Sequence, residues 1–108
     1  MYDFRVRWEA ERIANEIFES GGIKVMTGEE WRSLVKLARC SDKAMRYVQS
    51  VFEDVGLRTI ERPRNQGDLV VVYHPRTYAG QKLDRALGRP VLEVTERWWA
   101  PIHRRKAS

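Results

Sequence analysis

The residue types best suited to chemistry in this chain are cations and hydroxyls that recur at helical spacing in the segment 41–55. One side of that segment carries two basic residues, a tyrosine and a serine: Lys43, Arg46, Tyr47 and Ser50. Arg and Lys can form bidentate hydrogen bonds with guanine edges, and Ser and Tyr can reach phosphate oxygens. Ser41, as an N-cap, would also place the free amides and positive end of a helix near an anion.

The sequence gives little support for a metal site, a reactive thiol or a catalytic motif. His74 and His103 are far apart in sequence and belong to no Cys/His/acid cluster at metal-ligand spacing. The single Cys40 is better explained as a small apolar filler at a turn than as a reactive thiol. The chain contains no nucleophile elbow, P-loop, zinc-protease or dinucleotide-binding motif. We therefore expect no enzyme, no metal and no cofactor, and no small-molecule ligand is evident.

Charge is divided unevenly along the 108 residues, which amount to one domain. Residues 1–54 hold 9 Lys/Arg and 10 Asp/Glu, whereas residues 55–108 hold 11 Lys/Arg and 5 Asp/Glu. The basic half favours a polyanionic partner such as nucleic acid, although an ordinary basic surface without a partner has the same composition. No apolar run approaches ~18 residues and the N-terminus lacks a signal-peptide pattern, so we expect a cytoplasmic protein without membrane contact.

Two helices are predicted in the central stretch. Thr27 and Glu30 have the T-x-x-E spacing of a capping box, and Ser41 is placed to cap the next helix. Core positions follow at helical spacing in both segments: Trp31, Leu34, Val35 and Ala38, then Met45, Val48, Phe52 and Val55. Gly56 is placed to end the second helix.

Further elements are predicted on either side. Residues 3–20 form a helix whose apolar stripe includes Phe4 and Trp8, and residues 23–26 form a strand. Two strands, 58–62 and 69–73, are joined by a polar turn, and residues 77–87 suit a short helix. Residues 90–99 fit a helix or a strand, with the helix favoured, and residues 100–108 form a basic tail.

The segment LARCSDKAMRYVQSVFEDVGL, followed by RTIER, resembles the winged helix-turn-helix superfamily. The resemblance covers residues 27–75, and the first helix and strand complete the usual helix-strand-helix-helix-strand-strand order. It implies an α+β winged helix-turn-helix fold over residues 1–75, with a three-helix core and a small β-hairpin wing. Residues 76–99 would be a C-terminal helical extension that could dimerise. Arg39 departs from the pattern, because Gly is common at that turn.

The resemblance also assigns roles to residues. In the major groove it places the capping serine and the polar side of the second central helix: Ser41, Lys43, Arg46, Tyr47 and Ser50. Over the minor groove or the phosphates it places residues of the wing: Arg58, Arg62, Arg64 and Asn65. Flanking backbone would be clamped by Arg32, Lys36 and Arg39.

These observations predict a duplex-DNA-binding protein, a small homodimeric transcriptional regulator that would be nucleoid-associated if bacterial or archaeal. An alternative is a winged-helix module that binds another protein within a larger assembly, and a weaker one is binding of RNA or single strands. Trp98 and Trp99 cannot share one face of a helix or strand, so one of them is a candidate partner contact.

Overall fold

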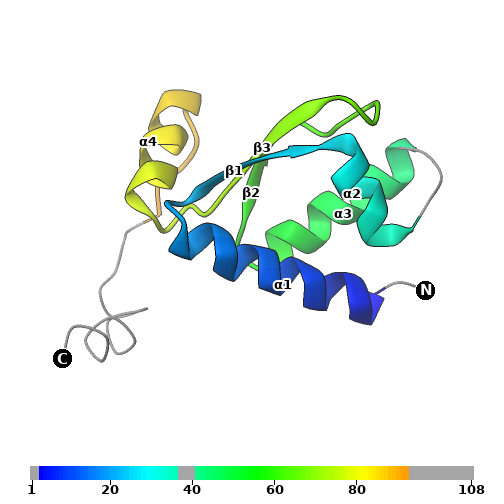
Figure 1. Ribbon diagram of the computed structural model, residues 1–108. Coiled ribbons are helices and arrows are strands. Elements are labelled where there is room, and N and C mark those ends of the chain that lie inside the picture. Colours follow the sequence, from blue (N-terminus) through cyan, green and yellow to red (C-terminus); the bar gives the residue numbers. More distant parts are fainter. Residues whose placement is uncertain (1–2, 37–40, 93–108) are drawn as a thin grey trace.

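The structure is a computed structural model that describes residues 3–36 and 41–92. Over these ranges the chain forms an α+β fold of four helices and one three-stranded antiparallel sheet (Figure 1). In chain order the elements are α1 (Asp3–Glu19), β1 (Ile23–Thr27), α2 (Gly28–Val35), α3 (Asp42–Asp54), β2 (Arg58–Ile60), β3 (Leu69–Tyr73) and α4 (Tyr78–Leu87).

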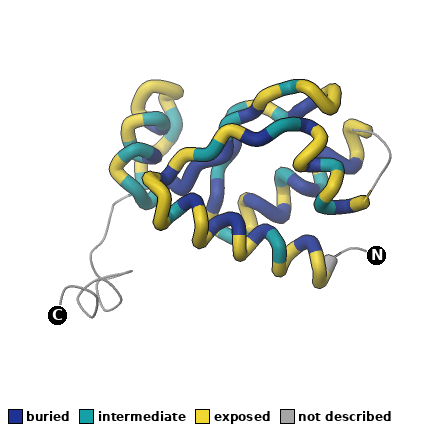
Figure 2. Tube along the Cα trace, viewed as in Figure 1, coloured by how far each residue is buried: buried dark blue, intermediate teal, exposed yellow. Residues whose placement is uncertain are grey.

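The sheet has the order β1-β3-β2, so β3 is central and pairs with both neighbours. Val71 lies opposite Val25 of β1 and Ile60 of β2, which fixes the register of all three strands. Successive side chains point to opposite faces of a strand, and the buried Val70 and Val72 face the inner side. Helices α1, α2 and α3 cover that inner side, and the hydrophobic core lies between the two layers (Figure 2).

Helix α1 buries the aliphatic residues of the expected apolar stripe but not its first two aromatic residues. Its core residues are Val6, Ala10, Ile13, Ala14 and Ile17, whereas Phe4 is 86% exposed and Trp8 is 59% exposed. Phe4 and Trp8 each precede a core position by two residues, and two residues turn a helix by about 200°. The prediction that these aromatic rings join the core stripe was therefore wrong.

Helices α2 and α3 follow the predicted pattern. The hydroxyl of Thr27 accepts a hydrogen bond from the amide of Glu30, whose carboxylate accepts one from the Thr27 amide, so the capping box is confirmed. The rings of Trp31 and Phe52 meet edge to face with 5.2 Å between centroids, which locks α2 onto α3. Val35, Met45 and Val48 are buried as expected, and Ala38 lies outside the described residues.

The β2–β3 hairpin is confirmed, but β2 ends at Ile60 rather than at residue 62. Glu61 adopts a left-handed φ of 64°, a conformation that breaks the strand ladder. The loop 61–68 then folds back on α2, where the amide of Gly28 donates to the carbonyl of Asp68 at 2.9 Å. A Cβ on Gly28 would overlap the backbone carbonyl of Asn65, so only glycine allows this close approach.

Helix α4 lies at one end of the outer face of the sheet (Figure 1). It is capped by Thr77 at its start and by left-handed Gly88 at its end, so residues 90–92 are not helical. The remainder of the segment 90–99, with Trp98 and Trp99, and the predicted basic tail lie outside the described residues. Among the helices described, none has the length and apolar character needed to cross a bilayer.

Candidate nucleic-acid interface

The polar side of α3 faces solvent over its first turns. Ser41 caps the helix, its hydroxyl accepting a hydrogen bond from the amide of Ala44 at 3.2 Å. The apolar positions point into the core, which leaves Lys43, Arg46 and Ser50 exposed on the opposite side. Tyr47 is half-buried and packs against the core, so its ring supports the helix as well as bordering its polar side.

Two arginines from different elements meet at one carboxylate at the start of α3. One oxygen of Asp42 forms an ion pair with Nε of Arg46 at 2.9 Å, and its other oxygen lies 3.4 Å from an Nη of Arg62. Arg46 comes from the second turn of α3, and Arg62 comes from the loop after β2. The carboxylate therefore holds two guanidinium groups side by side next to the helix N-terminus.

A chain of side-chain hydrogen bonds connects this pair of arginines to the sheet. Arg62 donates to the side-chain oxygen of Gln49 at 3.1 Å, and the Gln49 amide donates to the hydroxyl of Thr59 at 2.8 Å. Thr59 is buried on β2. These bonds fix Arg62 relative to both α3 and β2.

The hairpin loop beside α3 is held in shape by the carboxylate of Asp68, which belongs to the loop itself. Asp68 accepts hydrogen bonds from the amides of Arg64 and Asn65, at 2.9 and 3.0 Å, and these two bonds lower the pKa of its carboxyl group. The side chains of Arg64 and Asn65 remain exposed. Between this loop and the start of α3 lies an open hollow of about 350 Å³, lined by Asp42 and loop residues.

The residues predicted to touch DNA thus fall into separate groups. The structure brings together Arg46 and Arg62, with Lys43 exposed on the same helix and Arg64 lining the hollow beside them. Two further predicted residues belong to α2 and its end: Arg32 is half-buried, and Lys36 is exposed at the C-cap. Arg39 lies outside the described residues.

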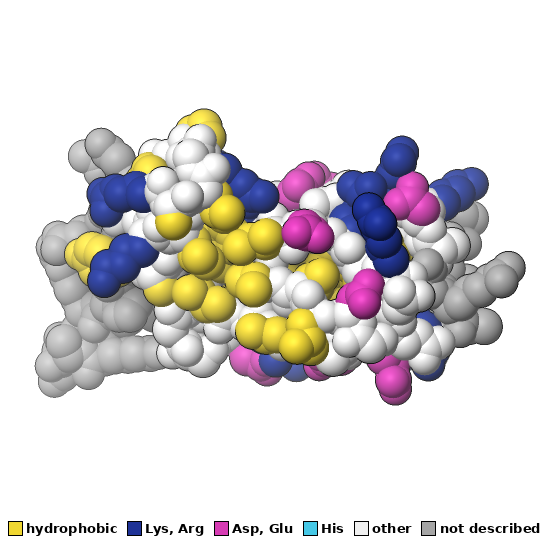
Figure 3. Space-filling model, turned by 90° about the horizontal axis from the view of Figure 1, so that it is seen from above, with side chains coloured by type: hydrophobic (Ala, Val, Ile, Leu, Met, Phe, Trp, Pro, Cys, Tyr) yellow, Lys and Arg dark blue, Asp and Glu magenta, His cyan; other side chains and the backbone are white. Residues whose placement is uncertain are grey.

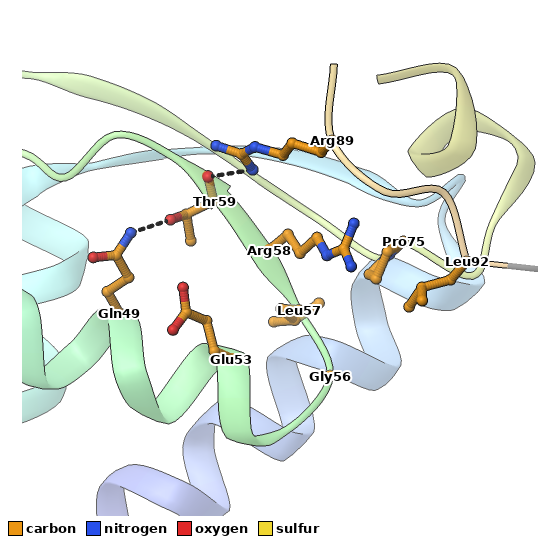
Figure 4. Close-up of a pocket in the computed structure, with 9 residues that line it drawn as sticks. All are labelled: Gln49, Glu53, Gly56, Leu57, Arg58, Thr59, Pro75, Arg89 and Leu92. Atoms are coloured by element: carbon orange, nitrogen blue, oxygen red, sulfur yellow. Dashed lines mark hydrogen bonds between the residues drawn. The ribbon is translucent and has the colours of Figure 1, made fainter. Parts of the chain in front are cut away.

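Arg58 does not belong to this group. Its guanidinium forms an ion pair of 2.7 Å with Asp84 of α4 and also donates to the carbonyl of Pro90. By the strand register it lies beside Tyr73, at the end of the sheet away from the hairpin loop. Figure 4 shows its side chain among residues of β2 and of the chain that follows α4. Arg58 therefore lies on β2 of the hairpin, as predicted, but its guanidinium is held by Asp84 and does not join the group at the hairpin loop.

A buried polar cluster around Asp84 was missed from the sequence. Asp84 is 0% exposed and accepts hydrogen bonds from Arg58 and from the hydroxyl of Tyr73. Burial, followed by the bond to Asp84, raises the pKa of Tyr73. Arg89 donates to that hydroxyl at 3.0 Å and to the carbonyl of Thr59 at 2.9 Å (Figure 4). One sequence signal was available: Gly80 lies four residues before Asp84, and a Cβ at Gly80 would overlap the carbonyl of His74, just after β3.

His74 is also a buried titratable side chain, and it lies just after β3. Burial, with a smaller contribution from the charge of Arg76, lowers its pKa to about 4. Its Nδ1 accepts a hydrogen bond from the Arg76 amide at 3.3 Å, and its ring lies 5.0 Å from that of Phe18. The imidazole is therefore neutral at pH 7 and serves as part of the core. In the parts of the chain that the structure describes, no three His, Cys, Asp or Glu side chains gather as metal ligands.

Comparisons of this chain with protein-family models, with curated proteins and with solved structures find no match. The class that the fold defines is an α+β domain with a small antiparallel sheet. A function has to be inferred from the geometry of the residues themselves.

Proposed function

We propose that this protein binds duplex DNA as a winged helix-turn-helix domain, inserting α3 in the major groove. The observation that carries the proposal is the pair of guanidinium groups, Arg46 and Arg62, held together beside the exposed N-terminus of α3. A helix fits the major groove of B-DNA, and arginines there can contact guanine edges or phosphates. Helix N-termini add free amides and a positive dipole end.

The layout of the elements supports the same conclusion. The order helix-strand-helix-helix-strand-strand, with the first strand paired to the last, is the layout that the winged-helix resemblance implies. The hairpin loop lies beside the start of α3, where a wing would contact the adjacent phosphates or minor groove. In this proposal Arg64 and Asn65 extend the contact surface from the helix to the loop, while Arg58 has no part in it.

The acids on this surface limit its affinity. Asp42 neutralises part of the charge of Arg46 and Arg62, and Glu61 also lines the hollow beside them. Net attraction then depends on cations outside the cluster, above all Lys43 and Arg64. Binding should therefore be moderate at physiological salt and strong only at low ionic strength.

A salt titration of duplex binding tests the proposal. Fluorescence anisotropy with a labelled random-sequence duplex should show affinity falling steeply as salt increases, because each neutralised phosphate releases counterion. Lys43→Ala/Arg46→Ala should weaken binding more than about tenfold and reduce the slope of log K against log salt by about 1.8. Arg7→Ala/Arg12→Ala removes the same charge from α1 and serves as the control.

Equal losses in the two variants would mean that only overall charge matters and that α3 is not the contact surface. No detectable binding by the unmodified protein at low salt would end the proposal.

A second function, docking to another protein, is favoured by one observation. The outer face of the sheet exposes large apolar side chains, with Val25 55% and Leu69 69% exposed. Such a face is typical of a contact surface rather than of a free one. Loss of duplex binding together with retained protein association would favour this function over DNA binding.

A further inference from the structure

The outer face of the sheet is apolar beyond the part that α4 covers. By the strand register, Val25, Val71 and Ile60 form one row across the three strands, and Leu69 lies in the next row towards the hairpin loop. Val25 is 55% exposed and Leu69 is 69% exposed. Figure 3 shows a continuous patch of hydrophobic side chains over these strands. Soluble proteins seldom leave such a patch open to water, so we expect it to be covered.

Helix α4 covers only the neighbouring row of this face. Its buried Asp84 binds Arg58 and Tyr73, which lie opposite each other in the strand register. The chain after α4 then passes β2, where Arg89 donates a hydrogen bond to the carbonyl of Thr59 (Figure 4). These contacts hold the chain at one end of the face and leave the two apolar rows uncovered.

The described chain ends at Leu92, close to the same end of the sheet. The carbonyl of Leu92 accepts a hydrogen bond from the side chain of Gln81 on α4 at 2.9 Å. Its side chain lines a hollow together with Arg58 of β2 and Pro75, which follows β3 (Figure 4). Residues 93–108 therefore start beside the strands whose outer face is open.

The chain that follows Leu92 is long enough to reach the uncovered rows. Each residue of a strand advances about 3.4 Å, so Ile60 lies about 7 Å beyond Arg58, and the row of Leu69 lies about 7 Å further. An extended chain spans about 3.3 Å per residue, so the six residues from Leu92 to Trp98 span up to about 20 Å. Trp98 can therefore lie over either row.

The residues beyond Leu92 carry apolar side chains at a spacing that suits a flat apolar face. Val94 and Trp98 are four positions apart. Positions four apart lie on the same side of a helix, and positions an even number apart lie on the same side of a strand. Val94 and Trp98 therefore present one apolar side in either conformation, whereas Trp99 shares its side with Thr95.

We propose that residues 93–99 of the same chain pack across the outer face of the sheet, with Val94 and Trp98 against the two uncovered apolar rows. Tethering favours this segment over a separate molecule, because a segment joined by a short linker has an effective concentration on the order of millimolar. Trp99 then points away from the sheet. Any partner that docks on this face has to displace the segment first.

Urea denaturation of the full chain tests the packing of Trp98. Trp98→Ala should lower the transition midpoint, because an apolar side chain that is buried only in the folded protein is lost. Trp99→Ala is the matched control, since it removes the same side chain from the adjacent position, and it should leave the midpoint unchanged. Equal midpoints for the two variants, whether lowered or not, would overturn the proposal.

Substitutions on the sheet identify the surface that Trp98 contacts. Val25→Glu should lower the midpoint by itself and should remove most of the further effect of Trp98→Ala, because losses at residues in contact are not additive. Leu69→Glu repeats this test from β3, so the proposal stays testable if circular dichroism shows that Val25→Glu does not fold. Phe4→Glu on α1 is the control, since that side chain is 86% exposed in the other layer, and its effect should add to that of Trp98→Ala.

Additive losses with both sheet variants would overturn the proposal, because Trp98 would then pack elsewhere. Protein concentration separates packing within one chain from packing between two. The coupling between Val25→Glu and Trp98→Ala should be the same in dilute and concentrated protein, and a coupling that disappears on dilution would show that the segment packs on a second copy instead. Duplex binding takes no part in these measurements, so this proposal and the proposed function can fail separately.

Discussion

Replacing Arg58 with methionine should destabilise the protein more than any surface substitution. The change removes the only cation within ion-pair distance of Asp84 in the described residues and leaves a carboxylate that is 0% exposed. Removing one partner of a buried ion pair typically costs about 3–5 kcal/mol, and we expect about 3 because Tyr73 still donates to Asp84. A domain of this size has roughly 5–15 kcal/mol of stability in total.

Urea denaturation followed by circular dichroism measures the effect. The transition midpoint of Arg58→Met should fall sharply while the slope m stays the same, because the surface exposed on unfolding is unchanged. The double variant Arg58→Met/Asp84→Leu removes both charges and should recover part of the lost free energy, since an apolar pair often replaces a buried ion pair at little cost.

The double-mutant cycle tests directly whether the ion pair between Arg58 and Asp84 stabilises the fold. If Arg58 and Asp84 stabilise the fold through each other, the losses in free energy of unfolding in Arg58→Met and Asp84→Leu will add up to more than the loss in the double variant. The expected difference is more than about 1 kcal/mol. Additive losses, or a loss below about 0.5 kcal/mol in Arg58→Met, would mean that α4 is held to the sheet by other contacts and that the ion pair is incidental.

Two further outcomes follow from the packing. Gly28→Ala should lower the free energy of unfolding by more than about 1 kcal/mol, because a Cβ there overlaps the carbonyl of Asn65. Gly67→Ala in the same loop meets nothing within 4 Å and should stay within about 0.5 kcal/mol of the unmodified protein; equal effects in urea denaturation would contradict this account of the loop. His74 has a folded pKa of about 4, below the ordinary 6.5, so the unfolded chain takes up its proton first as pH falls. The free energy of unfolding should be unaffected above pH 7 and should drop by up to about 3 kcal/mol between pH 6.5 and 4. His74→Leu should flatten that part of the stability curve, and an unchanged slope would show that carboxyl groups cause it.

Local signals in the sequence were enough to predict α2, α3 and the hairpin. The capping box at Thr27 and the cap at Ser41 involve residues three positions apart, and the core positions of α3 repeat with the period of the helix. For the same reason the exposed polar side of α3 was predictable. Interactions of this kind join residues that are close in the sequence, so they can be predicted from a single amino-acid sequence.

The errors come from contacts between residues distant in the sequence. Arg58 and Asp84 are 26 positions apart, and periodicity cannot show that a charged residue on α4 is buried by an arginine on β2. On α1 the apolar stripe is broad, and only packing against α3 and β1 decides that Val6 is buried and Phe4 is exposed. The cluster at Asp42 likewise depends on Arg62, which lies 20 positions further along the chain in the hairpin loop.

The backbone hydrogen bonds between the hairpin loop and α2 have a consequence for motion. Both Gly28 and Glu29 donate at 2.9 Å to loop carbonyls, so the loop cannot move without losing its hydrogen bonds to the first turn of α2. Side-chain bonds from Arg62 to Gln49 and Asp42 attach the same loop to α3. Helices α2 and α3 and the hairpin loop are therefore expected to form one rigid unit. Such a unit would bind a ligand with little loss of conformational entropy, but it could not change shape to follow a bent or widened groove.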